Sequence, residues 1–173
     1  MEVSKDTFKA VYDCAPEWLQ WAMKTAFCLC LRPGLVELFG LKWSSFDFAR
    51  GSVTVRQGKS GILKTVIPPL PYMEEAALRH NEAAAVGQEY VCTKNGKRVI
   101  CYSGAWHKAC RLAGVTMRPY DIRHLAATTM IAAGADLSSV AAQLGHQNCA
   151  MTGKFYAHVT SSGQRNAGQA LAM

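Results

Sequence analysis

Apolar residues recur at helical spacing in the N-terminal part of the chain. Ser4 is placed to cap a first helix, and Pro16 fits the first turn of a second helix that runs to about Leu31. Most faces of the second helix are apolar, so we expect it at the centre of the domain. The apolar face of the first helix comprises Phe8, Val11 and Tyr12.

A break at Gly34 separates the second helix from a shorter third one, after which the pattern changes. The buried side of the short helix is expected to comprise Leu35, Leu38, Phe39 and Leu41. Alternation with period two then predicts a small antiparallel sheet of three strands. The alternating positions are Phe46 and Phe48, then Val53 and Val55, then Leu63, Thr65 and Ile67. Turns at 50–51 and 58–61 separate these strands, and Pro68-Pro69 ends the last one.

Helical spacing returns for the rest of the chain. A helix is predicted over 71–81, and Asn95-Gly96 indicates a minor hairpin. Glycines and capping residues delimit further helices. These run from a Ser103 cap to about Leu112 before Gly114, from Ile122 to Ala133 before Gly134, from an Asp136 cap to a stop at Gly145, and over Met151–Tyr156. Residues 159–173 are expected to be a flexible tail or one that docks on a neighbouring copy. The predicted fold class is α+β, mainly α.

The length and charge narrow the function classes. The chain has 173 residues, about one domain, and its net charge is +7. Residues 1–86 contain ten Lys and Arg and nine Asp and Glu. Residues 87–173 contain nine Lys and Arg but only three Asp and Glu. A basic half indicates a polyanion partner, most simply nucleic acid, although a basic solvated surface is the plain alternative. The N-terminus lacks a signal peptide, so we expect a cytoplasmic protein without a membrane segment. Seven cysteines, without a C-x-x-C pair, are expected to be reduced thiols.

Four separated segments carry residues suited to one chemistry. Arg32 ends the second helix, and Lys59 lies on a turn between strands. The third segment places Arg123 at a helix start and His146 just past a helix stop, and the fourth places Tyr156 ten residues after His146. Together they suit phosphodiester transesterification. Two arginines can clamp the non-bridging oxygens of the transition state, and a tyrosine can be the nucleophile. A lysine can protonate the leaving alkoxide and a histidine can donate to the phosphate, so no metal or other cofactor is required.

These segments resemble the catalytic domain of the tyrosine recombinases, the phage integrase family. The resemblance is carried by TAFCLCLRPGLVELFGLKW, by YDIRHLAATTMIAAGADLSSVAAQLGH and by the spacing to Tyr156 in MTGKFYAHV. It implies that Arg32 and Arg123 are the catalytic arginines, that Lys59 is the hairpin lysine, that His146 is the second histidine and that Tyr156 is the nucleophile. Arg56 and Lys64 are rivals of Lys59.

The sequence departs from the family pattern at two places. The acidic residue usually follows the first arginine by three positions, whereas Glu37 follows Arg32 by five. A two-residue insertion at Leu35-Val36 is therefore expected, disturbing only the start of a helix. Tyr120 stands where the family has the first histidine of its H-x-x-R box. Because a phenol is a poor base at neutral pH, Tyr120 is expected to donate a hydrogen bond to a phosphate oxygen. We expect Glu37 and His124 to be structural and Trp43 to pack in the core.

The resemblance also implies an organisation and partners. Residues 1–173 would form a single catalytic domain, the C-terminal domain of a longer integrase whose N-terminal core-binding domain is absent from this chain. The implied partners are double-stranded DNA and further copies of the protein, as a tetramer on DNA, with a bacterial or phage origin. The basic residues expected on the DNA face are Lys94, Lys97, Arg98, Lys108, Arg111 and Arg118. The open alternatives are a non-catalytic DNA-binding relative, a type IB-like topoisomerase and a helical protein-interaction domain.

Overall fold

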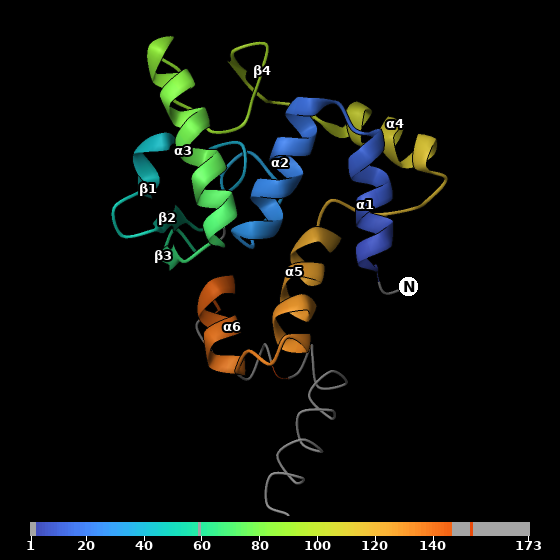
Figure 1. Ribbon diagram of the computed structural model, residues 1–173. Helices are drawn as coiled ribbons and strands as arrows, with labels where there is room; N and C mark the ends of the chain where they lie inside the picture. The colour runs from blue at the N-terminus through green and yellow to red at the C-terminus, as the bar shows by residue number, and fades with distance from the viewer. Residues whose placement is uncertain (1–2, 59, 147–152, 154–173) are drawn as a thin grey trace, which may run out of the picture.

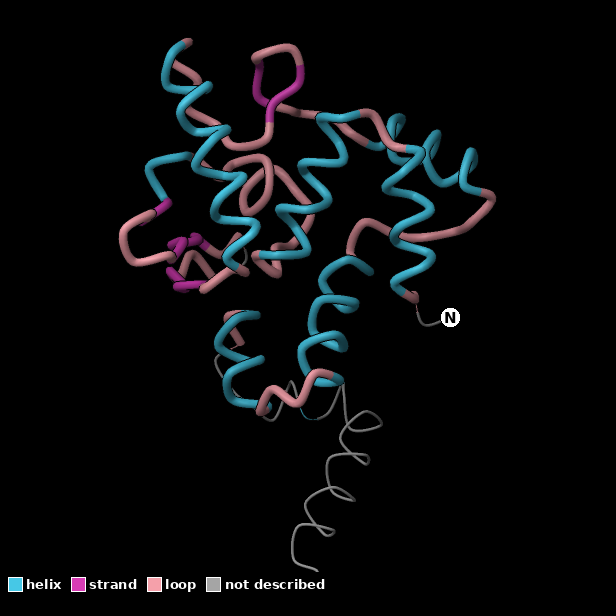
Figure 2. The backbone as a smooth tube through the Cα atoms, in the orientation of Figure 1, coloured by secondary structure: helices cyan, strands magenta, loops and turns pink. Residues whose placement is uncertain are grey.

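The computed structural model describes residues 3–58, 60–146 and 153 (Figures 1 and 2). Its elements are α1 (Lys5–Cys14), α2 (Glu17–Cys28), the 3₁₀ turn η1 (Trp43–Ser45), β1 (Phe46–Asp47), β2 (Ser52–Arg56), β3 (Leu63–Val66), α3 (Leu70–Ala85), β4 (Thr93–Lys94), β5 (Lys97–Arg98), α4 (Ser103–Ala113), α5 (Asp121–Ala132) and α6 (Leu137–Leu144). This mainly helical α+β architecture confirms the predicted fold class. None of the helices in the described part combines the length and apolar character needed to cross a bilayer.

Helix α2 is the central element, as its apolar pattern predicted. It lies between α3 on one side and α1 on the other in Figure 1. Ser4 caps α1 through a bond to its Oγ from the Thr7 amide (3.1 Å). Pro16 precedes α2 as its N-cap residue. The buried side chains of α2 are Leu19, Trp21, Ala22, Met23, Thr25 and Ala26.

The end of α2 differs from the prediction. The helix stops at Cys28, three residues before Leu31, because Cys30 adopts a left-handed conformation with φ of 51°. The Leu31 amide then bonds back to the Ala26 carbonyl (2.9 Å), which closes the helix end. Glycine usually occupies this left-handed position. A side chain there costs about 1–2 kcal/mol, so other contacts must hold the turn.

Residues 35–40 form turns and not the predicted short helix. Leu38, Phe39 and Leu41 are buried as expected, but Leu35 is exposed. The expectation that only the start of a helix is disturbed here is therefore wrong, because residues 35–40 form no helix. The reason is Glu37, which is buried and turns its carboxylate back to accept the Arg32 amide (2.9 Å).

The three-stranded sheet is confirmed, with β2 in the middle and antiparallel to both neighbours. Val53 and Val55 of β2 are buried and pair with Val66 and Lys64 of β3. Strand β3 therefore turns Lys64 and Val66 inward. Its alternating set Leu63, Thr65 and Ile67 faces outward.

The later elements follow the prediction closely. The β4–β5 hairpin turns through Asn95-Gly96, both with positive φ. Ser103 is the first residue of α4 and not its cap, which is Tyr102. Asp136 caps α6 through the amides of Ser138 and Ser139. The predicted helix at 151–156 and the tail at 159–173 lie outside the described residues, except Gly153.

Two apolar clusters hold these elements together. The larger one joins α1 to α4 and the sheet. The smaller one joins the end of α2 to α5 and α6, and it comprises Cys30, Ala126, Ala127, Ile131, Val140 and Leu144. In Figure 2, α5 and α6 form a pair below the rest of the molecule. The smaller cluster therefore fixes the angle at which this pair meets α2.

Gly145 at the end of α6 is expected to be irreplaceable by alanine. Its φ is +69°, and a Cβ there would lie 1.9 Å from Nε2 of Gln57. Gly145→Ala should lower the free energy of unfolding by about 2–4 kcal/mol, from left-handed strain and overlap together. Urea denaturation measures the loss. The matched control is Gly114→Ala, because Gly114 has φ of +67° but open space around it. Equal losses in the two variants would contradict the close approach.

Candidate active site

Two helix ends converge beside β3 and bring their free carbonyl groups together. The last carbonyls of a helix have no partner within the helix. Carbonyls just beyond α2 are on Leu29 and Cys30, and those at and just beyond the end of α6 are on Gln143, Leu144 and Gly145. Helix C-termini also carry partial negative charge, which favours cations. The site is built around the donors that satisfy these carbonyls.

Arg123 is the first of these donors. It lies in the first turn of α5 and is only 2% exposed. Its Nη1 donates to the Cys30 carbonyl (2.5 Å) and its Nη2 to the Leu144 carbonyl (2.5 Å). Burial, and then repulsion from Arg32, lower the pKa of its guanidinium. A guanidinium carries five N–H groups, so these two bonds do not exhaust it.

Lys64 is the second donor, and sequence reasoning placed it only among the rivals of Lys59. It is 6% exposed, and its Nζ donates to the carbonyls of Leu29 (3.4 Å), Cys30 (3.2 Å) and Gln143 (3.0 Å). Burial, and then repulsion from Arg123, lower the pKa of Lys64 to about 8. Three carbonyls hold this ammonium in the interior, so Lys64 is not a mobile acid. The alternation in this segment pointed to Leu63, Thr65 and Ile67 as the inward positions, so it gave no signal for Lys64.

Two glutamines complete the attachment of α6. The Gln57 side chain, buried after β2, donates to the Gly145 carbonyl (2.6 Å). The Gln143 amide bonds both the N–H (3.1 Å) and the carbonyl (2.8 Å) of Ile67. It thereby covers the open edge of the sheet as a neighbouring strand would. Gln143 lies directly before Leu-Gly-His in the quoted family segment, but sequence analysis assigned no role to either glutamine.

Arg32 forms the open side of the site. Its side chain is 30% exposed, and its Nη1 donates to Oε1 of Glu37 (2.7 Å). The same carboxylate accepts the amide of Gly58 (3.2 Å), on the turn between β2 and β3. Burial alone would raise the pKa of Glu37, but the hydrogen bonds from Arg32 and Gly58 lower it below its ordinary value. Glu37 is therefore a buried anion that orients Arg32, as the structural interpretation of this residue expected.

Tyr120 and His146 lie near the arginines. Burial opposes protonation of Arg32, yet Glu37 and then the Tyr120 hydroxyl raise its pKa. Burial lowers the pKa of His146, and Arg123 and Arg32 lower it further. Its surroundings therefore favour the neutral form of the His146 ring. Tyr120 precedes α5, is 41% exposed, and meets the His124 ring edge-on at 5.0 Å. The structure thus brings Arg32, Arg123, His146 and Tyr120 together.

The other two predicted residues, Lys59 and Tyr156, lie outside the described residues. The residues on either side of Lys59 are tied to the site. Gly58 bonds Glu37, and Ser60 Oγ donates to the Gln57 side chain (2.9 Å), which in turn holds Gly145. Within 3–58, 60–146 and 153, no three His, Cys, Asp or Glu side chains come together as a possible metal site.

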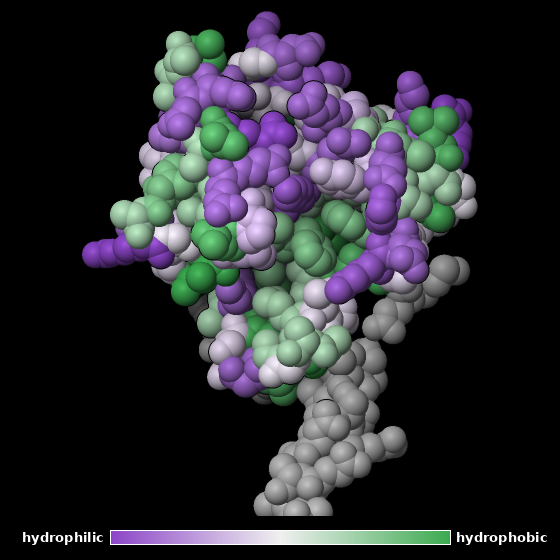
Figure 3. Space-filling model, in the orientation of Figure 1, coloured by the Kyte–Doolittle hydropathy of each residue, from purple (hydrophilic) through white to green (hydrophobic). Residues whose placement is uncertain are grey.

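The basic residues expected on the DNA face are all exposed, but three of them are engaged within the protein. Lys94 Nζ lies 5.5 Å from the centre of the Trp18 ring. Arg98 donates to the carbonyls of Phe39 (2.9 Å) and Leu35. Arg118 pairs with Asp121 (2.8 Å). In Figure 3, hydrophilic residues gather over the upper part of the molecule, around the β4–β5 hairpin, while hydrophobic colour is prominent lower down around α5 and α6.

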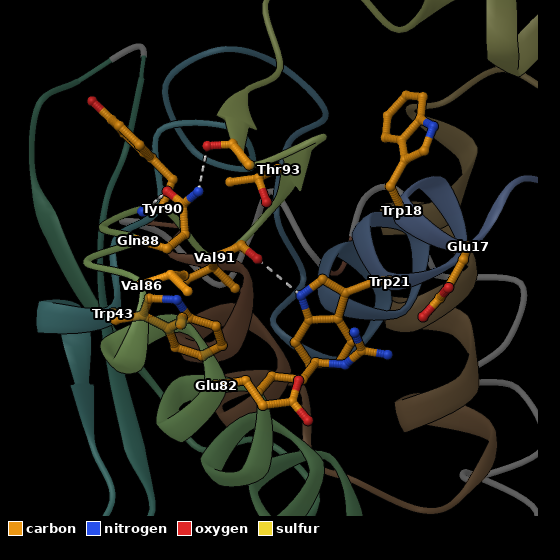
Figure 4. Close-up of a pocket in the computed structure, with 13 residues that line it drawn as sticks. Glu17, Trp18, Trp21, Trp43, Glu82, Val86, Gln88, Tyr90, Val91 and Thr93 are labelled. Atoms are coloured by element: carbon orange, nitrogen blue, oxygen red, sulfur yellow. Dashed lines mark hydrogen bonds between the residues drawn. The ribbon is translucent and has the colours of Figure 1, made fainter.

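A separate aromatic pocket lies at the other end of α2 (Figure 4). Its volume is about 330 Å³, and its walls include Trp18, Trp21, Trp43 and Tyr90. The Arg79 guanidinium lies 4.4 Å from the Trp21 ring, and Trp21 Nε1 donates to the Val91 carbonyl (3.0 Å). Trp43 is buried in the larger cluster, as expected. Neither Arg32 nor Arg123 lines this pocket.

The chain is similar to known recombinases and integrases. The profile of the phage integrase family matches residues 2–162. Tyrosine recombinase XerA of Thermococcus kodakarensis is 30% identical over 137 residues, which cover 76% of this chain and 48% of the relative. Prophage integrase IntR of Escherichia coli is 29% identical in an alignment 192 positions long, gaps included, that covers 89% of this chain and 46% of the relative. The chain spans about half the length of these relatives.

Solved structures show the same fold. The crystal structure of XerA recombinase superposes with a TM-score of 0.73 at 22% identity, covering 100% of this chain and 64% of that one. The catalytic domain of bacteriophage HP1 integrase gives a TM-score of 0.70 at 16% identity, covering 96% and 92%. The family profile covers most of this chain, and the fold matches recombinase catalytic domains. The protein therefore belongs to the phage integrase family, with the fold of a tyrosine recombinase catalytic domain.

Proposed function

We propose that this chain is the catalytic domain of a site-specific recombinase that cuts and rejoins DNA strands. The observation that carries the proposal is the meeting of Arg32, Arg123 and His146, from the end of α2, the start of α5 and the end of α6, at one place. Two guanidinium groups there can clamp a phosphate whose charge grows in the transition state. Family membership supports this assignment.

The proposed reaction is a pair of transesterifications. The Tyr156 hydroxyl gives up its proton to water, and its oxygen attacks the scissile phosphorus, forms a 3′-phosphotyrosine bond and displaces the 5′-oxygen of the neighbouring nucleotide. Lys59 supplies the proton to that oxygen, and His146 donates a hydrogen bond to the phosphate. A second 5′-hydroxyl then attacks the phosphotyrosine and restores both the phosphodiester and the tyrosine. The bond energy is kept, so no nucleotide hydrolysis is needed.

We further propose that the working form contains several copies on DNA. Supporting this, solved structures of the fold include a lambda integrase dimer bound to a COC' core site and a lambda integrase tetramer bound to a Holliday junction. The proposal extends to a cytoplasmic, bacterial or phage-encoded protein, and to residues 1–173 as one domain of a longer integrase.

Covalent trapping tests the central step. The target site is first selected from a randomised duplex library by binding to this chain, and then nicked so that the cut fragment diffuses away. The wild-type chain should accumulate a protein–DNA adduct. Tyr156→Phe should bind the same DNA and form none, because only the nucleophilic oxygen is lost.

Three other outcomes would overturn the assignment. An adduct that persists in Tyr156→Phe moves the nucleophile to another tyrosine, with Tyr102 and Tyr90 as the next candidates. DNA binding without any adduct indicates a non-catalytic relative. Adducts with relaxation of supercoils but no recombinant product indicate a type IB-like topoisomerase.

Salt dependence tests the proposed DNA face. The logarithm of the DNA association constant should fall with that of salt concentration by about 0.9 per phosphate contacted. Lys97→Gln, Lys108→Gln and Arg111→Gln should each reduce this slope by about 0.9, because these side chains are exposed. Titration of a duplex at several salt concentrations measures it. A slope near zero in the wild-type chain would contradict a DNA-binding face.

Tyr120 is proposed to donate a hydrogen bond to the scissile phosphate. Arg32 has only donors, so the Tyr120 oxygen accepts from it and its own proton is left to donate. Tyr120→Phe should slow single-turnover cleavage by about 10- to 100-fold with DNA affinity near wild type. Tyr120→His should keep or raise the rate and add an inflection near the histidine pKa. A Phe variant as fast as wild type would make Tyr120 structural.

A further inference from the structure

The turn between α2 and Arg32 has an unfavourable backbone conformation. Cys30 has φ of 51°, the left-handed region that favours glycine. It lies two residues before Arg32, so its backbone sets the direction in which the chain leaves α2. Such a conformation persists only where surrounding contacts hold it.

Two cations hold the carbonyl of this residue. The Cys30 oxygen accepts from Lys64 Nζ (3.2 Å) and from Arg123 Nη1 (2.5 Å). Lys64 also holds the preceding carbonyl, that of Leu29 (3.4 Å). Both peptide units around the left-handed residue are therefore tied to β3.

The ammonium group of Lys64 also binds α6. Lys64 donates to the Gln143 carbonyl (3.0 Å), three residues before His146. The side chain is buried and its bonds span two helix ends, so it faces the protein interior and not a bound phosphate. Its position suits fixing backbone geometry.

We infer that Lys64 is a positioning residue that holds the left-handed turn at Cys30 and thereby aims Arg32 at the phosphate. The inference rests on the proposed function only in calling the target of Arg32 a scissile phosphate. Its structural part concerns the placement of the Arg32 side chain, which is measurable without DNA cleavage.

The first measurement follows the side-chain N–H resonances of Arg32 and Arg123 by NMR in the full chain. Lys64→Met should shift and broaden the Arg32 signal, because the turn relaxes when two of its carbonyl bonds are lost. Lys5→Met is the matched control, since Lys5 is exposed on α1, and it should change neither signal. Lys64→Arg, which keeps a cation, should restore the Arg32 signal at least in part.

The second measurement titrates inorganic phosphate onto the same resonances. Lys64→Met should weaken phosphate affinity at Arg32 by about fivefold or more, the change expected when roughly 1 kcal/mol is lost. Cys30→Gly alone should bind phosphate as the wild-type chain does. The double variant Cys30→Gly with Lys64→Met should recover most of the affinity, because glycine adopts the left-handed turn without support.

The outcomes separate the possible roles of Lys64. An unchanged Arg32 signal and unchanged phosphate affinity in a folded Lys64→Met protein would overturn the inference, since Lys64 would then only add stability. Weakened phosphate binding that Cys30→Gly does not recover would also overturn it, because the charge of Lys64 would act directly. If Lys64→Met does not fold, the double variant still decides between recovery and loss. Absence of a DNA adduct in the wild-type chain would count against the proposed function and leave these readouts intact.

Discussion

The structure depends on satisfying the free carbonyl groups of two helix ends that meet in the interior. The carbonyls of Leu29 and Cys30 belong to one end, and those of Gln143, Leu144 and Gly145 to the other. Each of them left without a donor would cost about 1–3 kcal/mol. Arg123, Lys64 and Gln57 supply the donors, and the partial negative charge of the helix ends offsets the burial of two cations. Arg123, which is proposed to bind phosphate, therefore also stabilises the fold.

This arrangement explains how the domain tolerates its departures from the family pattern. Glu37 lies two residues later in the sequence than the family pattern has it. It still accepts a hydrogen bond from Arg32, and residues 35–40 form turns in place of the predicted helix. The carboxylate also anchors the turn that carries Lys59, through Gly58. Tyr120 occupies the position of a histidine and still interacts with Arg32. The departures at Glu37 and Tyr120 change which groups bind Arg32, while Arg32 and Arg123 still lie near each other.

Much of the fold could be predicted from local patterns, because caps, glycine stops and the Asn95-Gly96 turn act within a few residues. The helices after residue 100 and the antiparallel sheet followed from such signals. The errors came from long-range demands. The chain just after α2 is held by donors from β3 and α5, namely Lys64 and Arg123. The inward position of Lys64 is stabilised by the carbonyls that its ammonium binds at two helix ends. Alternation along β3 could not reveal this, since Leu63, Thr65 and Ile67 looked like the apolar face. The four described site residues were identified through motif order, whereas Gln57 and Gln143 bind backbone groups and matched none of the family's site positions.

The central claim is that Arg32 and Arg123 act together on one phosphate. A crystal structure of this chain with a nicked duplex and orthovanadate, which adopts the five-coordinate geometry of the transition state, tests it most directly. The account predicts vanadate oxygens within hydrogen-bond distance of both guanidinium groups, with Arg123 still bonded to the carbonyls of Cys30 and Leu144. Vanadate held by Arg32 alone, or bound away from both arginines, would contradict it.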